Sequence, residues 1–172
     1  MMRMLTVIDA LCDRLGRAVA WLALLMVLLM CTVVVLRYVF GIGWIWMQES
    51  VTWLHGTAFM LAAAWTLQRD EHVRVDILYR GMTDRRQALV RIIGTLVFLA
   101  PVCIFLFVQS LDYVHDAWRF REQSRDAGGL PYPFTPLLKS VIPLTAALLL
   151  LQGLALAIRD LAGLRGHRAP GT

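Results

Sequence analysis

Charged residues are scarce in this sequence, and four long stretches contain none. Only 17% of its 172 residues are charged, whereas 59% are hydrophobic, and the mean hydropathy is +0.64. This balance excludes an ordinary soluble domain, in which about a quarter of the residues are charged. The stretches without Asp, Glu, Lys or Arg are 18–36, 51–68, 92–111 and 140–158.

Each of these stretches is long enough for one helix to cross a bilayer. At about 1.5 Å per residue, roughly 19 residues cover about 28 Å, which is close to the ~30 Å hydrocarbon core. None of them alternates like a barrel strand, so a helix is the structure that satisfies its backbone polar groups in lipid. The sequence therefore predicts an all-α integral membrane protein with one domain over 1–172. The expected transmembrane spans are about 18–36, 45–68, 89–111 and 137–158.

Residue patterns that carry catalysis or hold a metal are also lacking. The three cysteines, Cys12, Cys31 and Cys103, have no paired spacing, so we expect no disulfide and no metal. The sequence has no phosphate-binding glycine loop, no nucleophile beside a base and no ligand cluster, so we expect no enzyme activity and no cofactor. The net charge of +5 lies between the spans, which indicates contact with membrane lipids rather than with nucleic acid.

Basic residues are distributed unevenly between the two sides of the predicted bundle. Twelve lie in the N-terminal segment, the loop between the second and third spans and the C-terminal segment, and only five lie on the other side. The positive-inside rule then places both termini in the cytoplasm, around a bacterial inner membrane. Aromatic belts agree with this orientation. The outer belt comprises Tyr38, Trp44, Trp46, Trp53, Tyr113, Trp118 and Tyr132.

The segment before the first span has an amphipathic pattern. Apolar positions recur every three or four residues, at Leu5, Ile8, Leu11, Cys12 and Leu15. Charged positions lie elsewhere around the helix, at Asp9, Asp13, Arg14 and Arg17. This pattern predicts a short N-terminal helix that lies in the cytoplasmic interface.

Few ionisable side chains lie within or beside the predicted spans. His55 lies inside the second span, about a turn and a half beyond Glu49, and is either a hydrogen-bond partner for another helix or a proton relay. Arg37 and Glu49 flank the outer turn between the first two spans. They can pair there as a hairpin staple, or contact a partner subunit.

Two further features have alternative interpretations. The cytoplasmic segment His72-Val73-Arg74-Val75-Asp76 alternates apolar and charged residues, and it is either a solvated loop or a docking segment for a partner.

Pro101 and Pro143 lie within predicted helices, which we expect them to kink. Such kinks give the bundle its shape or act as hinges.

The order of these motifs resembles a known family. Leu36-Arg37-Tyr38-Val39-Phe40-Gly41 closes the first span, Trp46-Met47-Gln48-Glu49 opens the second, and His72-Val73-Arg74-Val75-Asp76 follows it. Together they resemble the small membrane subunit of tripartite ATP-independent periplasmic (TRAP) transporters, of the DctQ type, over nearly the whole chain. The sequence departs from this family at Gln48, where an acidic residue is common, so only Glu49 of an acidic pair is present.

The resemblance implies that the protein is a scaffold. In such transporters the small subunit packs against a large membrane subunit, which carries the solute and coupling-ion sites. A periplasmic solute-binding protein delivers the solute, usually an organic acid or a related compound, and sodium is the usual coupling ion. The candidate interface residues are then Arg37, Tyr38, Trp46, Glu49, His72, Arg74 and Asp76, with His55 as a polar contact inside the membrane.

Two other functions compete with this interpretation. A haem-binding bundle needs axial ligands, but the other histidines lie outside the predicted spans and leave His55 without an apparent partner. A self-sufficient small carrier needs an acidic group within the membrane, and Glu49 lies close to the outer boundary.

Overall fold

The computed structural model describes residues 2–69 and 81–166, and this part of the chain is helical without any strand. The elements are α1 (Met2–Val39), α2 (Ile45–Gln68), α4 (Asp84–Gly94), a π-helical turn η1 (Thr95–Leu99), α5 (Ala100–Arg119) and α6 (Phe134–Gly166). The predicted all-α class is therefore confirmed for the described residues.

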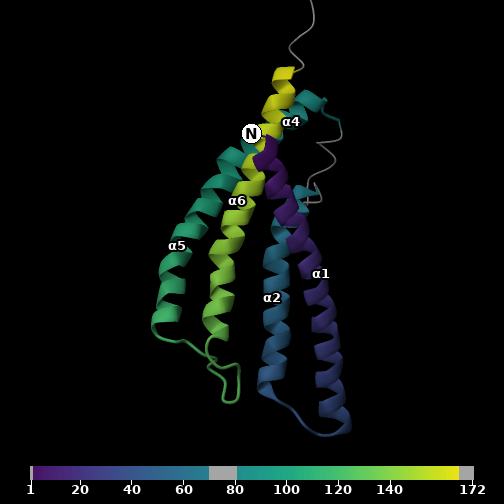
Figure 1. Cartoon of the computed structure of the whole chain (residues 1–172), viewed down its shortest axis with the longest axis vertical. Coiled ribbons are helices and arrows are strands. Elements are labelled where there is room, and N and C mark those ends of the chain that lie inside the picture. Colours follow the sequence, from purple (N-terminus) through teal and green to yellow (C-terminus); the bar gives the residue numbers. More distant parts are fainter. Residues whose placement is uncertain (1, 70–80, 167–172) are drawn as a thin grey trace, which may run out of the picture.

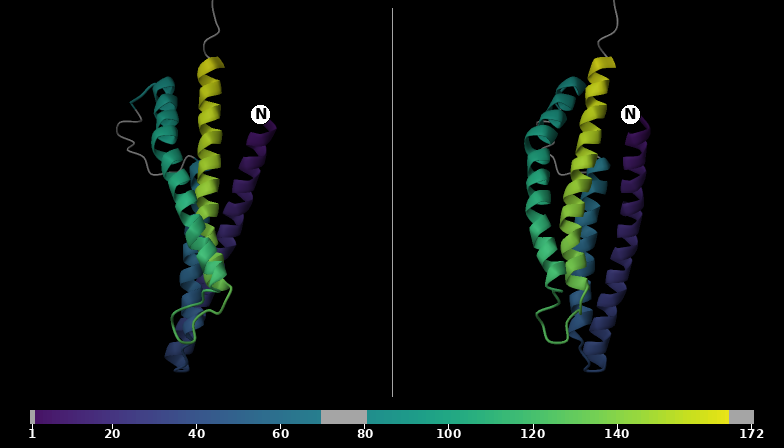
Figure 2. Two further views of the ribbon diagram at one scale, coloured as in Figure 1. Left: turned by 90° about the vertical axis from the view of Figure 1, so that its left-hand side faces the viewer. Right: turned by 60° about the vertical axis from the view of Figure 1, so that its left-hand side comes forward.

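The long helices stand side by side in the order α1, α2, α6, α5 (Figure 1). α1 and α2 form one hairpin, α5 and α6 form another, and α2 packs against α6. The two hairpin loops lie at one end of the bundle, and the start of α1, the end of α6 and α4 lie at the other, as the turned views in Figure 2 also show. The bundle thus has a hairpin end and a terminal end.

Three helical segments are long and apolar enough to cross a membrane. They are Val7–Val39, Asp84–Arg119 and Phe134–Leu164. α2 has 24 residues, which is sufficient length, but polar side chains such as His55 and Gln68 lower its hydropathy. The number of four transmembrane spans therefore stays a prediction.

A separate N-terminal interfacial helix is not confirmed. α1 runs for 38 residues from Met2 to Val39 as one helix, so the amphipathic segment forms its first turns. Gly16 permits close contact with α2 in this region, because a Cβ atom there would lie 2.6 Å from the indole ring of Trp65. The first turns of α1 consequently pack against the bundle instead of lying apart from it.

The third long helix contains a wide turn. α4, η1 and α5 follow one another from Asp84 to Arg119, and η1 occupies the positions between Gly94 and Ala100. A Cβ atom at Gly153 of α6 would lie 2.4 Å from Leu99 Cδ2, so this glycine allows α6 to approach the wide turn closely. Pro101 is the second residue of α5, after the wide turn, and Pro143 lies inside the long helix α6.

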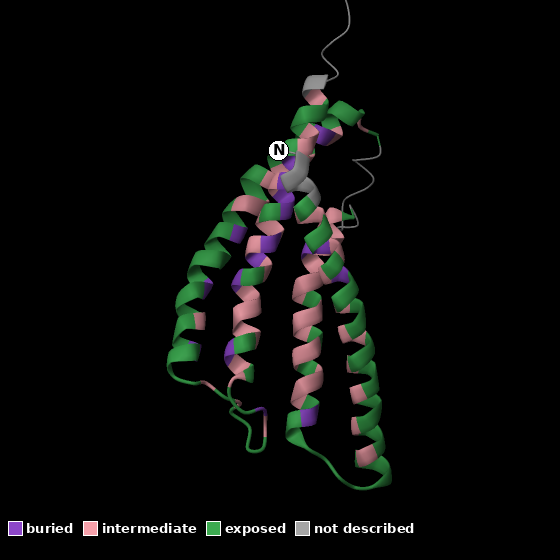
Figure 3. Cartoon of the chain, in the orientation of Figure 1, coloured by how far each residue is buried: buried purple, intermediate pink, exposed green. Residues whose placement is uncertain are grey.

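The buried core is small and lies toward the terminal end. Cys12, Ala64 and Leu148 are buried together and join α1, α2 and α6. Figure 3 shows that α6 carries many buried positions, whereas α1 and α5 are exposed along most of their length. Trp21 of α1 and Phe105 of α5, for example, are exposed although both are large and apolar. Such surfaces suit lipid or another membrane protein.

Candidate functional site

At the hairpin end, Glu49 of α2 binds the loop between α5 and α6. Its Oε2 atom accepts a hydrogen bond of 2.7 Å from the backbone N–H of Leu130. The backbone N–H of Trp46 donates to the carbonyl oxygen of Gly128 at 3.1 Å. Leu130 is itself buried. The first turns of α2 are therefore the surface on which this loop is fixed.

Two glycines shape the bound loop. Gly128 has a φ of +81°, a left-handed conformation that glycine adopts without steric cost. A Cβ atom at Gly129 would lie 2.3 Å from Ser124 Oγ and 2.6 Å from Glu49 Oε2. A side chain at this position would displace Ser124 or Glu49, so a glycine at 129 lets the loop reach Glu49 without moving either group.

The other candidates at the hairpin end are exposed. The expected Arg37–Glu49 ion pair is absent from the described part of the chain, because Glu49 bonds to the loop and Arg37 is exposed near the end of α1. The Tyr38 side chain is exposed, and Trp46 stacks on Trp44 with their ring centres 6.4 Å apart. Arg37, Tyr38 and Trp46 are thus free to contact headgroups or a partner.

A second group of contacts ties α5 to α6 at the same end. Lys139 Nζ lies 2.5 Å from Glu122 Oε2 and 3.7 Å from the centre of the Tyr113 ring. Trp118 Nε1 donates to Ser140 Oγ at 3.1 Å. These contacts satisfy the lysine inside the chain, so Lys139 does not contribute an unpaired charge to the surface.

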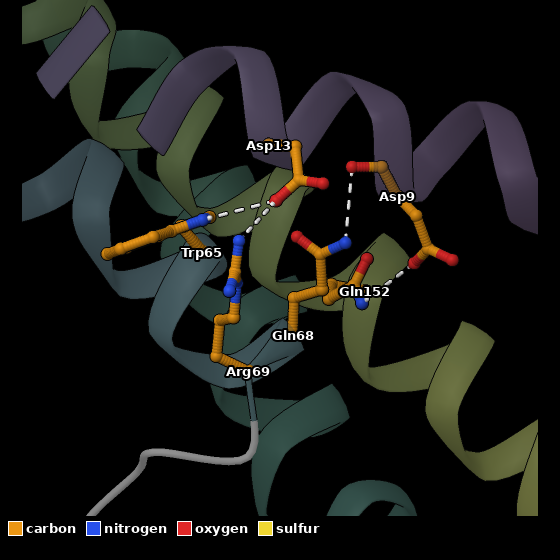
Figure 4. Close-up of polar contacts among 6 residues, drawn as sticks. All are labelled: Asp9, Asp13, Trp65, Gln68, Arg69 and Gln152. Atoms are coloured by element: carbon orange, nitrogen blue, oxygen red, sulfur yellow. Dashed lines mark hydrogen bonds and ion pairs between the residues drawn. The ribbon is translucent and has the colours of Figure 1, made fainter. Parts of the chain in front are cut away.

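At the terminal end, Asp9 connects three helices (Figure 4). Its carboxylate accepts from Arg159 Nη2 and, at 3.4 Å, from Gln152 Nε2, both on α6. Its backbone carbonyl accepts from Gln68 Nε2 of α2 at 3.2 Å. Gln152 is completely buried, and its Oε1 lies 3.6 Å from Cys12 Sγ. The sequence predicted that Asp9 lies on the polar side of an interfacial helix. In the structure its carboxylate instead points into the bundle, toward α6.

Asp13, one turn further along α1, binds α2 in the same way (Figure 4). Its Oδ1 accepts from Trp65 Nε1 at 3.4 Å and from Arg69 Nη2 at 3.2 Å. The Arg69 guanidinium also lies 5.3 Å from the centre of the Trp65 ring, within the range of a cation–π contact. Asp9 and Asp13 together bind the first turns of α1 to α2 and α6.

A third ion pair joins α4 to α6. Arg91 Nε and Nη2 donate to the two carboxylate oxygens of Asp160 at 2.6 and 2.5 Å. This two-point geometry holds both side chains in one orientation. The terminal end is therefore held by ion pairs that involve α1, α2, α4 and α6.

His55 lies between the two polar ends. Its side chain is exposed on a cavity of about 430 Å³ between α1 and α2. It makes no hydrogen bond or ion pair with another described residue. The other candidates, His72, Arg74 and Asp76, lie outside the described residues.

Sequence reasoning did not single out Gln68 or Gln152 as site residues. Both are uncharged polar residues in otherwise apolar stretches, Gln68 at the end of 51–68 and Gln152 inside 140–158, and that contrast was the available signal. Over residues 2–69 and 81–166, no three side chains of His, Cys, Asp or Glu gather in a way that could hold a metal ion. The hydrogen bonds and ion pairs between helices are gathered at the two ends of the described bundle, and the helices between them present mostly apolar surface.

A protein-family model matches most of the chain. The family model described as "Tripartite ATP-independent periplasmic transporters, DctQ component" matches residues 26–163. This range includes α2, α4, η1, α5, most of α6 and the second part of α1. Searches of curated proteins and of solved structures find no match.

Proposed function

The chain belongs to the DctQ family of TRAP transporter components, and we propose that it serves as the scaffold on which the large membrane subunit is held. The family consists of small permease subunits and is not a family of enzymes. It implies association with a large membrane subunit and a periplasmic binding protein.

The observation that supports a scaffold is the distribution of charge. A carrier places ionisable groups inside its bundle, because solute or ion binding there requires them. In the described part of this chain the carboxylates of Asp9, Asp13 and Asp160 are paired with arginines at the terminal end, and Glu49 is used by a loop. A protein built in this way offers a rigid apolar surface to another subunit.

The proposal includes an orientation. Both termini lie in the cytoplasm of a bacterial inner membrane, and the two hairpin loops lie in the periplasm. The excess of basic residues in the terminal segments and in the loop between the second and third predicted spans supports this orientation. Glu49, Tyr38 and Trp46 then lie on the periplasmic side, where a solute-binding protein arrives.

We take the transport cycle of the whole complex from the family to which the chain belongs. The binding protein delivers an organic acid or a related solute, and the large subunit moves it into the cell together with sodium. This chain contributes assembly and anchoring, so its removal stops transport without changing the affinity of the binding protein for the solute.

Reconstitution into liposomes tests the proposal. Three preparations are compared under an inward sodium gradient: this chain alone, the large subunit with the binding protein, and all three together. Uptake is expected only with all three. Sodium-driven uptake by this chain alone, or full uptake without it, would contradict the scaffold function.

A further inference from the structure

One side of the α1–α2 hairpin carries a groove that α5 and α6 do not line. The cavity there has a volume of about 430 Å³. It is lined from α1 by Val27, Met30 and Cys31 and from α2 by Val51, Thr52 and His55. The α1 side chains are exposed in the chain by itself. The groove is thus an apolar surface with two polar side chains on one wall.

The polar side chains of the α2 wall, above all His55, indicate what kind of molecule occupies this groove. His55 is exposed there and has no hydrogen-bond partner in the described chain. Lipid tails offer an imidazole neither a donor nor an acceptor, and an unpaired polar group in hydrocarbon is costly. A protein helix with a polar side chain or a free carbonyl satisfies the imidazole. The groove therefore suits a protein better than it suits lipid.

The opposite side of the same hairpin differs. A cavity of about 330 Å³ there is lined by α1 and α2 residues such as Leu25 and Trp53, but also by Leu130 and Phe134. Those two residues belong to the outer loop and to the start of α6, so the chain borders this side with its own segments. Of the two sides of the hairpin, the one that carries His55 is open to a partner.

We propose that a transmembrane helix of the large membrane subunit lies in the His55 groove and forms a hydrogen bond with His55. This assignment rests on the proposed scaffold function and adds to it the face of the chain that makes the contact. The family provides the partner, because its members are components of a transporter with several subunits. Met26 and Met30 suit such a contact, since unbranched thioether side chains adapt to the shape of a neighbour.

Photo-crosslinking in the assembled complex tests the choice of face. Benzoylphenylalanine replaces either Val27, in the groove, or Leu25, on the opposite side. These residues are 53% and 51% exposed and stand two positions apart in α1, so the probes differ mainly in the side they face. We expect the probe at Val27 to crosslink to the large subunit and the probe at Leu25 to give little of this product.

The outcomes separate this inference from the proposed function. Equal yields from the two positions, or a higher yield from Leu25, overturn the choice of face and leave the scaffold function standing. Crosslinks from Val27 only to lipid, or only to a second copy of this chain, also overturn it. If the wild-type chain forms no complex with the large subunit, the scaffold function itself is wrong and the inference falls with it.

Substitution of His55 tests the hydrogen bond. His55→Leu is expected to raise the dissociation constant of the two-subunit complex by about three- to tenfold, the range for one polar contact between membrane helices. His55→Gln, which keeps a donor and an acceptor, is expected to restore most of the affinity. The melting temperature of the chain alone should not fall, because His55 has no bond to lose within the described chain. An unchanged dissociation constant for His55→Leu would overturn the proposed hydrogen bond.

Discussion

Asp9 and Arg159, 150 positions apart in the sequence, form an ion pair that joins the first helix to the last. The same carboxylate accepts from Gln152, and the backbone of Asp9 accepts from Gln68, so three helices meet at one residue. At the opposite end, the two hairpins are connected through the bond between Glu49 and the loop at Leu130. The bundle is thus held by polar groups at both ends and by packing between them.

Removal of the Asp9 carboxylate should loosen the terminal end. Asp9→Ala takes an acceptor from Arg159 and from the buried Gln152, and a buried polar group that loses its partner costs about 1–3 kcal/mol. We expect the free energy of unfolding in detergent to fall by about this amount. Asp112→Ala is the matched control, since Asp112 is an exposed carboxylate that makes no hydrogen bond or ion pair with another described residue. Equal losses for the two variants would contradict the role given to Asp9.

Substitution of Glu49 should release the loop between α5 and α6. Glu49→Ala removes the acceptor for the Leu130 N–H, and we expect faster hydrogen exchange at the Leu130 amide. Glu49→Gln keeps a side-chain oxygen and should retain most of the protection. Gln48→Ala serves as the control, because the neighbouring Gln48 is exposed. Unchanged exchange at Leu130 in Glu49→Ala would show that the loop is held by other contacts.

Two glycines of α6 should respond differently to substitution by alanine. Gly163→Ala meets nothing within 4 Å and should stabilise the helix by up to about 1 kcal/mol, the propensity difference between the two residues. Gly153→Ala places a Cβ atom 2.4 Å from Leu99 Cδ2, so Leu99 must move and the gain should be lost or reversed. Thermal unfolding of both variants measures this difference. A combined Gly153→Ala, Leu99→Ala variant that is no more stable than Leu99→Ala alone would contradict the steric explanation.

The orientation in the membrane can be measured directly. Twelve basic residues in the terminal segments and the loop between the second and third predicted spans, against five in the other segments, predict cytoplasmic termini and a periplasmic position for Gly128. A reporter that is active only in the periplasm should be inactive when fused at Thr172 and active when inserted at Gly128. Activity at Thr172 would reverse the proposed topology.

The sequence predicted the helical class well, because long stretches without charge allow few other structures in lipid. Periodicity also shows which residues share one side of a helix, but it does not show what lies opposite that side. Asp9 and Asp13 share one side of α1, and on this basis they were expected to face the polar interface. Their partners on α2 and α6 lie 52 to 150 positions away, at separations that no local pattern reveals.

The predicted Arg37–Glu49 pair, at the hairpin end, also shows that a sequence pattern does not reveal a partner that is distant in the chain. The two residues are close in sequence and opposite in charge, which favoured a pair. The structure instead places the Leu130 N–H 2.7 Å from Glu49, and the glycine that permits this approach is 80 positions further along the chain. Arg37 was the more obvious partner for Glu49 because it is close in sequence, whereas the Leu130 N–H, which Glu49 binds, is far away in sequence.

The wide turn η1 also has a consequence for how this helix tolerates insertions and deletions. A π-helical turn holds one residue more than an α-helical turn, and each residue adds about 100° of rotation. Deletion of one residue from Thr95–Leu99 would restore a regular α-helix, and it would turn Arg91 away from Asp160 or turn Cys103 and Ser110 away from their buried positions. The extra residue thus sets the rotation of α4 relative to α5 about the helix axis. The contacts of both α4 and α5 with α6 depend on this rotation.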